Sequence, residues 1–436
     1  MSLKNDFQTF INNLKPTNIS DMKITVGEIA KKLNNHYYNL SSDTTSHMYI
    51  VGSVGRTTSI KGGSDLDILF DLPHSTYKQY DSRTNNGQSA LLQEVKNVLK
   101  DRYPKTDISG DGQVVVINFS NYTVELVPGF KQADNNFRYP DTNNGGSWKI
   151  TKPLLEINES KSTAKDTDDN FRHIANMLRA WKNKQGFKFG GLLIDTLTYN
   201  FLNSKTEYRN IGFDSYLDMT KELFKYLKDL NKNQSYWYAL GSNQKVYNCD
   251  NGKFVTKAQN AYKKIEKLTE ESSNINKELR ELFGNKFPET TTRKVRDSYS
   301  DTEQFIEDMV QVDIKYSLHI DCKVTQNGFT PKLLSYILKN SMYLRPQKNL
   351  EFFIVDIDSQ IVGKYDVYWK VKNEGEIAKA RNCIRGEIIK QNSKKIYEHT
   401  DFKGEHYVEC YIIQNSVCIA MDRIDVPISN YENRME

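Results

Sequence analysis

The chain has 436 residues, 38% of them hydrophobic, so it can bury substantial cores and form about two or three domains. No apolar stretch reaches the roughly eighteen residues of a membrane span, and the N-terminus lacks the apolar core of a signal peptide, which predicts a cytoplasmic protein with no membrane partner. The net charge of +5 permits contact with nucleic acid without requiring it, and five scattered cysteines argue against a disulfide framework or a structural zinc site.

The first predicted element is a helix over residues 22–40, where apolar side chains recur at helical intervals. A short β-prone run at 48–51 follows, and Gly52 and Ser53 interrupt it. We therefore expect the chain to leave a strand and enter a short helix or loop. The backbone N–H groups of such a turn, together with the Ser53 hydroxyl, form a binding site for phosphate oxygens.

Residues 65–70 alternate charged and apolar side chains before becoming fully apolar, as a strand does between a cleft and a core. A period of two places Asp65 and Asp67 on the same side of that strand. Two crowded carboxylates are unfavourable unless a cation neutralises them, and hard oxygen ligands suit Mg²⁺, with Mn²⁺ as an alternative. The pair therefore predicts a divalent metal site.

A third acid is expected on a β-hairpin formed by residues 113–119 and 122–127, whose second strand carries Glu125. The acids Asp65, Asp67 and Glu125 would then be both the metal ligands and the catalytic residues of a two-metal nucleotidyl-transfer site. The alternative is that all three are solvated residues at strand edges, which a lone Asp-x-Asp would favour. The upstream Gly-Ser turn favours the catalytic interpretation.

The Asn/Asp/Gly-rich span 134–147 predicts a loop over the cleft, and helices are expected from 166 to 283. One of them, over residues 171–182, has an apolar face and ends at Lys182. A long helical segment at 254–283 carries several lysines, which suit either RNA or DNA binding or an ordinary solvated face.

Residues 284–310 are polar and contain a Gly and a Pro, which predicts a linker. Beyond it, an apolar residue at every second position over 311–320 predicts a strand, and further strands are expected at 352–355, 365–371, 385–389 and 407–413. The predicted organisation is a catalytic core with a helical lobe (1–283), a linker (284–310) and a β-rich domain (311–436).

Three residues of the β-rich domain, Trp369, Arg385 and His406, have side chains that suit contact with a nucleotide. The competing interpretation, which we favour, places Trp369 in the sheet core, Arg385 in a turn and His406 on the surface.

Together these motifs resemble the polymerase-β-like nucleotidyltransferases and, within them, the cGAS/DncV-like enzymes, the cyclic-oligonucleotide synthases of bacterial anti-phage defence. The similarity lies at residues 51–57, 64–67, 124–130, 146–153 and 177–182. The C-terminal part resembles the sensor domain appended to some of these synthases, at residues 369–375, 384–388 and 404–411.

The resemblance implies an α+β fold: a polymerase-β-like core with a helical lobe, followed by a β-rich sensor-like domain. It further implies that Gly52 and Ser53 hold the donor triphosphate, that the three acids hold two Mg²⁺ ions, and that Lys182 contacts the phosphates. A solvated helix lysine is the alternative for Lys182. In the family the third acid is more often Asp, and Glu125 departs from that pattern.

The expected function is a magnesium-dependent nucleotidyltransferase that joins nucleoside triphosphates into a cyclic oligonucleotide second messenger for anti-phage defence. Its expected partners are nucleoside triphosphates, RNA or another activating ligand, and a downstream effector that responds to the product. Two alternatives remain: a nucleotidyltransferase that makes a linear product or tags RNA, protein or a small molecule, and a binding module without catalysis.

Overall fold

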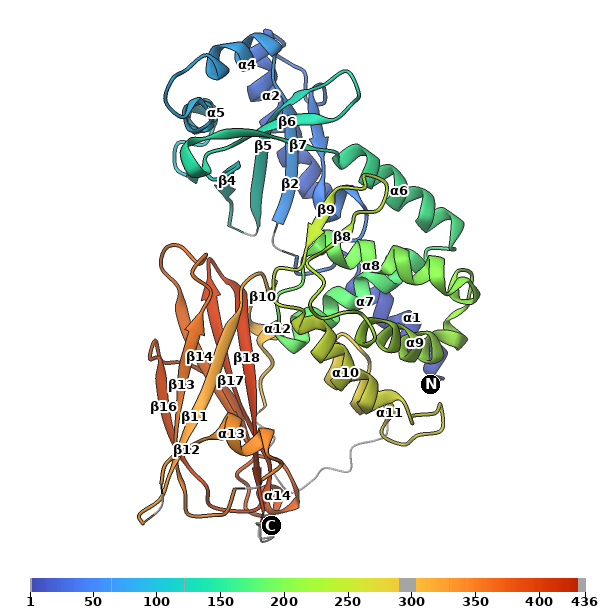
Figure 1. Cartoon of the computed structure of the whole chain (residues 1–436), viewed down its shortest axis with the longest axis vertical. Helices are drawn as coiled ribbons and strands as arrows, with labels where there is room; N and C mark the ends of the chain where they lie inside the picture. The colour runs from blue at the N-terminus through green and yellow to red at the C-terminus, as the bar shows by residue number, and fades with distance from the viewer. Residues whose placement is uncertain are drawn as a thin grey trace.

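The computed structural model describes residues 2–63, 65–120, 122–289, 303–328, 330–342 and 344–429. Figure 1 shows an N-terminal region built on a sheet, a helical lobe beside it, and a β-rich C-terminal region in orange and red. The predicted α+β fold class is confirmed. Among the helices described, none has the length and apolar character needed to cross a membrane.

The N-terminal region is built on a seven-stranded sheet with the strand order β1-β2-β5-β4-β3, in which β6 pairs with both β5 and β7. β2 and β5 run parallel to each other, and the other neighbouring pairs are antiparallel. The strands are β1 (Met48–Ile50), β2 (Asp65–Asp71), β3 (Asp107–Asp111), β4 (Val114–Asn118), β5 (Thr123–Lys131), β6 (Phe137–Asp141) and β7 (Ser147–Thr151).

One face of this sheet is covered by helices. Leu66 and Ile68 of β2 and Leu126 of β5 are fully buried in a core shared with these helices. The helices of this region are α2 (Ile19–Tyr38), α3 (Gly52–Gly55), α4 (His74–Asp81) and α5 (Gly87–Arg102). The helix predicted at 22–40 is confirmed as α2, and the predicted hairpin is confirmed as the antiparallel pair β4 and β5.

The prediction of a loop over residues 134–147 is wrong. Most of this span forms β6 and the connection to β7, and the two strands pair from Phe137 with Thr151 to Asp141 with Ser147. The Asn and Gly residues lie in the tight turn between them, where Asn144, Gly145 and Gly146 take positive φ angles. Turn-forming residues within a hairpin were therefore mistaken for a long loop.

The helical lobe packs around Trp181, whose ring contacts the edges of Phe187 and Phe224. An N-terminal helix that the sequence pattern did not predict, α1, joins this lobe through Phe7 and Phe10. The segment 254–283 is two helices rather than one. The lobe consists of α1 (Leu3–Leu14), α6 (Pro153–Asp166), α7 (Asn170–Gln185), α8 (Gly191–Ser204), α9 (Tyr216–Lys228), α10 (Lys253–Ile265), α11 (Ile275–Phe283) and the short strands β8 (Tyr236–Tyr238) and β9 (Lys245–Tyr247).

The C-terminal region is a sandwich of a five-stranded sheet, β10-β18-β17-β14-β15, and a four-stranded sheet, β12-β11-β13-β16, that share one core. The strands predicted near 352, 365, 385 and 407 are confirmed. The elements are α12 (Ile306–Met309), β10 (Gln311–Val312), β11 (Leu318–Thr325), β12 (Lys332–Leu333), α13 (Leu334–Lys339), β13 (Asn349–Ile357), β14 (Asp366–Lys372), α14 (Glu376–Ala380), β15 (Arg385–Lys390), β16 (Lys395–His399), β17 (Gly404–Gln414) and β18 (Val417–Ile428).

The single strand predicted over 311–320 is wrong, because residues 313–317 separate β10 from β11 and the two strands belong to different sheets. β10 pairs in parallel with β18, and the N–H groups of Lys315 and Tyr316 then both donate to the carbonyl of Ile419, at 3.0 and 3.1 Å. The regular pairing between β10 and β18 ends at this point. The chain bends there and passes from one sheet to the other.

The predicted linker, 284–310, falls in part on residues 290–302, which lie outside the described residues. Toward the C-terminal end of this range the chain forms α12. At the other end, Asn285 donates from Nδ2 to the Asp308 carboxylate of that helix at 2.7 Å. The division into domains at these positions stays a proposal.

Candidate active site

The chain turns sharply after β1, and this turn contacts the acid-bearing strand. The Val51 N–H donates to the Asp67 carbonyl at 2.9 Å, and Gly52 follows with a φ of +59°. A Cβ atom on Gly52 would collide with the Asp67 carboxylate. The close approach of backbone and acid therefore requires glycine at this position.

A Gly52→Ala variant tests that close approach. Because the new methyl group would push Asp67 away and strain the backbone, we expect at least a tenfold loss of activity and about 1–3 kcal/mol less stability. Gly112 is a matched control, since its φ is +65° and nothing lies within 4 Å of its Cβ position. Gly112→Ala should show the backbone strain alone, so equal activity losses in the two variants would contradict this interpretation. The measurements are pyrophosphate release and urea unfolding.

The three predicted acids lie on one face of the sheet. In the parallel pairing of β2 and β5, Asp65 is opposite Thr123 and Asp67 is opposite Glu125. Leu66, Ile68 and Leu126 occupy the opposite, buried face, as the period of two requires. Burial, together with the charge of Asp65, raises the pKa of Asp67 to about 6, and burial with both aspartates raises the pKa of Glu125 to about 7.

A lysine from the C-terminal region lies among these acids. The Lys315 ammonium forms an ion pair with the Asp65 carboxylate, and its charge also acts on Asp67 and Glu125. Within the part of the chain that the structure describes, no three His, Cys, Asp or Glu side chains lie close enough together to hold a metal ion as they stand. In this arrangement the Lys315 ammonium, and not a metal ion, lies against the Asp65 carboxylate.

The donor set nevertheless suits Mg²⁺ or Mn²⁺. Asp65, Asp67 and Glu125 offer only hard carboxylate oxygens, which these cations prefer over nitrogen or sulfur ligands. The charge of Asp65 helps to raise the pKa of both Asp67 and Glu125, so a cation bound among these acids would be favoured. The assignment of the three acids as metal ligands stays a prediction.

Lys182 points toward the same cleft from α7. Its side chain is buried rather than solvated, so the surface-lysine alternative is wrong. The ammonium lies 3.3 Å from the Asp313 carboxylate, and burial lowers the pKa of Lys182. Its predicted role toward phosphates stays a prediction.

The cleft itself has a volume of about 460 Å³, within the usual range for small-molecule sites. The turn and the acids line the cleft together with residues of the helical lobe and of the C-terminal region. Among the residues that line it are Ser53, Arg56, Asp65, Asp67, Glu125, Arg179, Lys182, Asp313, Ile314 and Lys315. All the predicted site residues except Gly52 thus line one cavity, and Gly52 abuts it through Asp67.

The sequence pattern did not predict a buried charge cluster beside the cleft. Asp195 of α8 is fully buried and accepts hydrogen bonds from Arg56 Nε at 2.7 Å, from Arg179 Nη1 at 2.7 Å and from the Thr58 hydroxyl at 2.9 Å. The signal that could have found it is that Asp195 is the single charged residue of α8. This cluster ties the chain just after the Gly52–Ser53 turn to the helical lobe.

Of the three C-terminal candidates, Arg385 and His406 line a cavity of about 370 Å³, and Trp369 is not among its lining residues. Trp369 is core, and its indole N–H donates to the Ser393 carbonyl at 2.9 Å. Arg385 is the first residue of β15 rather than a turn residue, which corrects that expectation; it has a positive φ of 58° and its guanidinium donates to both Glu398 carboxylate oxygens at 2.7 and 2.9 Å. His406 is buried rather than on the surface, which corrects that part of the expectation.

The comparisons with known proteins agree with this geometry. Residues 1–163 match the Second Messenger Oligonucleotide or Dinucleotide Synthetase domain, and residues 300–429 match the Adenylyl/Guanylyl and SMODS C-terminal sensor domain. The chain belongs to the cGAS/DncV-like nucleotidyltransferases with a C-terminal sensor domain. The predicted family is therefore confirmed, and the C-terminal region is called the sensor domain below.

Individual relatives are distant. A probable cyclic nucleotide synthase from Bacillus cereus is 21% identical over 200 residues, which cover 38% of this chain and 60% of that protein. The structure of CdnC with ATP from Escherichia coli MS115-1 covers 66% of this chain and 99% of CdnC, with a TM-score of 0.52 and 15% identity. CdnC in its complex with HORMA-deltaN gives a TM-score of 0.50 at 14% identity over 65% and 98% of the two chains. These structures establish a shared fold.

Proposed function

We propose that this protein is a magnesium-dependent nucleotidyltransferase that joins nucleoside triphosphates into a cyclic oligonucleotide second messenger. The observation that supports it most is the position of Asp65, Asp67 and Glu125 on one face of β2 and β5, in a cleft that begins at the Gly52 turn. Membership of the synthetase family and the ATP bound by CdnC point the same way.

In this proposal the chain's own groups position the reactants. Backbone donors of the Gly52–Ser53 turn and the Lys182 ammonium bind the triphosphate, and the helical lobe excludes water from the cleft. Asp65, Asp67 and Glu125 would hold the divalent ions, which when bound neutralise phosphate charge and activate the acceptor hydroxyl. The acceptor hydroxyl gives up its proton to solvent as its oxygen bonds to the α-phosphorus, the bond from that phosphorus to the oxygen it shares with the β-phosphate breaks, and pyrophosphate leaves. A second transfer in the same cleft closes the ring.

The biological setting is also proposed. The protein acts in the cytoplasm in anti-phage defence, RNA or another activating ligand acts through the sensor domain, and a downstream effector responds to the product. Tagging of RNA, protein or a small molecule would use the same acids and differ only in the acceptor.

The test is incubation of the purified chain with the four labelled nucleoside triphosphates and Mg²⁺ or Mn²⁺, with and without added RNA. We expect metal-dependent pyrophosphate release and a product whose mass lacks any terminal phosphate, which indicates a ring. A product that keeps a terminal triphosphate would establish the linear alternative. Nucleotide binding without metal-dependent turnover in any mixture would contradict the proposed function.

A further inference from the structure

Two charged residues of the sensor domain lie inside the catalytic cleft. Lys315 pairs with Asp65, a proposed metal ligand, and Asp313 pairs with Lys182, the proposed phosphate-binding lysine, at 3.3 Å. Both residues line the same cavity as Ser53 and Glu125. Each therefore contacts a group of opposite charge that has another partner in the proposed reaction. That partner is a metal ion for Asp65 and a phosphate for Lys182.

The short segment 313–315 is held on both sides. The Asn183 side chain of α7 donates to the Val312 carbonyl at 2.8 Å and accepts from the Ile314 N–H at 3.1 Å. On the opposite side, the Asp313 and Lys315 N–H groups donate to the carbonyls of Cys418 and Ile419 on β18, each at 3.0 Å. Ile314 is buried between them. These bonds fix where the two charged side chains lie.

The two charges match the groups that a substrate complex would bring. An ammonium against Asp65 satisfies the carboxylate as a divalent cation would, and a carboxylate against Lys182 satisfies that ammonium as a phosphate would. An ammonium and a metal ion compete for the same oxygens.

We propose that residues 313–315 of the sensor domain form an autoinhibitory plug, in which Lys315 takes the cation's place at Asp65 and Asp313 takes a phosphate's place at Lys182. The plug has to withdraw before metal and triphosphate bind together. This inference rests on the proposed function, because it assigns the two contacts to the site of that reaction.

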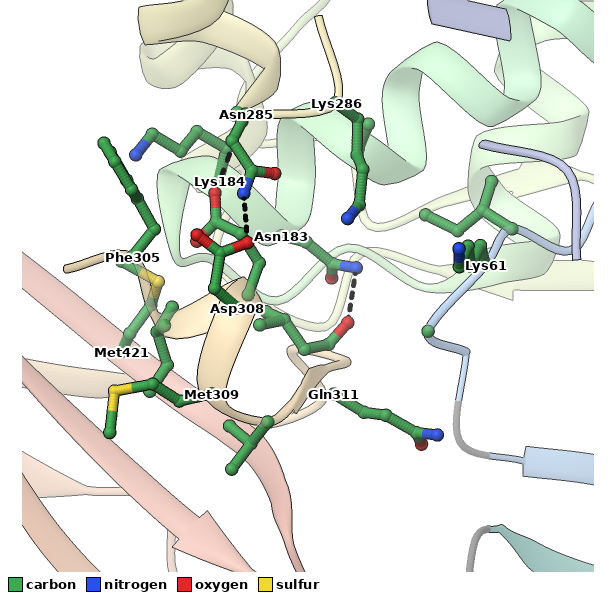
Figure 2. Close-up of a pocket in the computed structure, with 18 of the residues that line it drawn as sticks. Lys61, Asn183, Lys184, Asn285, Lys286, Phe305, Asp308, Met309, Gln311 and Met421 are labelled. Carbon is green, nitrogen blue, oxygen red and sulfur yellow. Dashed lines mark hydrogen bonds between the residues drawn. The ribbon is translucent and has the colours of Figure 1, made fainter. Parts of the chain in front are cut away.

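The segment that leads to the plug borders a cavity. Residues 305–312 line a space of about 490 Å³ between the sensor domain and the helical lobe, with Lys184, Asn285 and Lys286 on the lobe side (Figure 2). Met309, one of the residues that line this space, is exposed, so the space opens to solvent next to the plug. On the sensor-domain side, Ile306 and Ile314 pack in one buried cluster with Tyr411 and Met421, so withdrawal has to move this cluster or release the two side chains from it.

The proposal is tested by Mn²⁺ binding to the full chain without nucleotide, followed by the electron paramagnetic resonance signal of free Mn²⁺. If the plug is engaged in at least nine molecules of ten, Lys315→Gln should bind Mn²⁺ at least about tenfold more tightly than the wild type. Asp313→Asn, which keeps Lys315 but removes the contact with Lys182, should bind it more tightly by a smaller factor.

Matched controls come from an exposed pair of the same domain, Lys390 and Asp366, whose charged atoms lie 2.7 Å apart. Lys390→Gln and Asp366→Asn should bind Mn²⁺ as the wild type does. Equal Mn²⁺ affinity in the wild type, Lys315→Gln and Asp313→Asn would overturn the plug. Thermal unfolding of each variant confirms that the chain is folded.

Activity then separates the plug from a catalytic role of Lys315. Under the plug proposal, Lys315→Gln raises the basal rate of pyrophosphate release in the absence of any activator. A lower rate with unchanged Mn²⁺ affinity would overturn the plug and make Lys315 a catalytic residue. Failure of the proposed function has a different signature, since no variant and no mixture would then release pyrophosphate.

Discussion

The double variant Asp65→Asn and Asp67→Asn is expected to lose pyrophosphate release by at least about a thousandfold. The two carboxylates supply most of the negative charge that would hold divalent ions on β2, and the ions contribute several kcal/mol to neutralising the transition state. Asparagine keeps the shape of the side chain and can offer only a neutral oxygen. Turnover close to that of the wild type would contradict the assignment of these acids.

Stability should change little in that variant, which separates a catalytic effect from unfolding. The pKa of Asp67 is raised by burial and by Asp65, so removing both charges relieves repulsion in the folded state. Lys315 retains the nearby charges of Asp313 and Glu125. A urea unfolding midpoint close to that of the wild type is therefore expected. Asp101→Asn, at an exposed residue paired with Lys32 at 3.4 Å, is the control for both measurements.

The second large effect is expected at Asp195, where Asp195→Ala should lower the free energy of unfolding by about 3–5 kcal/mol. This carboxylate is fully buried and accepts charged hydrogen bonds from Arg56 and Arg179, so its removal leaves two buried guanidinium groups without their main counter-ion. Urea unfolding followed by circular dichroism measures the change.

An exposed acid of the same lobe provides the control. Asp218 pairs with Lys221 at 3.3 Å on the surface of α9, and such pairs contribute at most about 1 kcal/mol. Asp218→Ala should therefore lie within that range. If Asp195→Ala cost no more than Asp218→Ala, the cluster would not be a structural tie between the Gly52–Ser53 turn and the helical lobe.

The sequence by itself determined the elements whose signals are local. Alternation along residues 65–70 placed Asp65 and Asp67 on one side of a strand, and the pattern around Glu125 indicated the hairpin that carries it. Helical spacing indicated the apolar face of α7 that ends near Lys182. Such patterns can be interpreted without tertiary structure, because side-chain direction within one strand or helix follows from the backbone period alone.

Only the tertiary structure decided which residues meet across elements. The parallel register that sets Asp67 beside Glu125, the ties from Arg56 and Arg179 to Asp195, and the entry of Asp313 and Lys315 into the cleft all join segments distant in the chain. The period over 311–320 indicated one continuous strand. In the structure β10 pairs with β18 and ends at Val312, and the chain then bends toward the acids. The energy of an ion pair depends on the distance between the two charges and on how deeply they are buried. The packing of elements against one another sets both quantities.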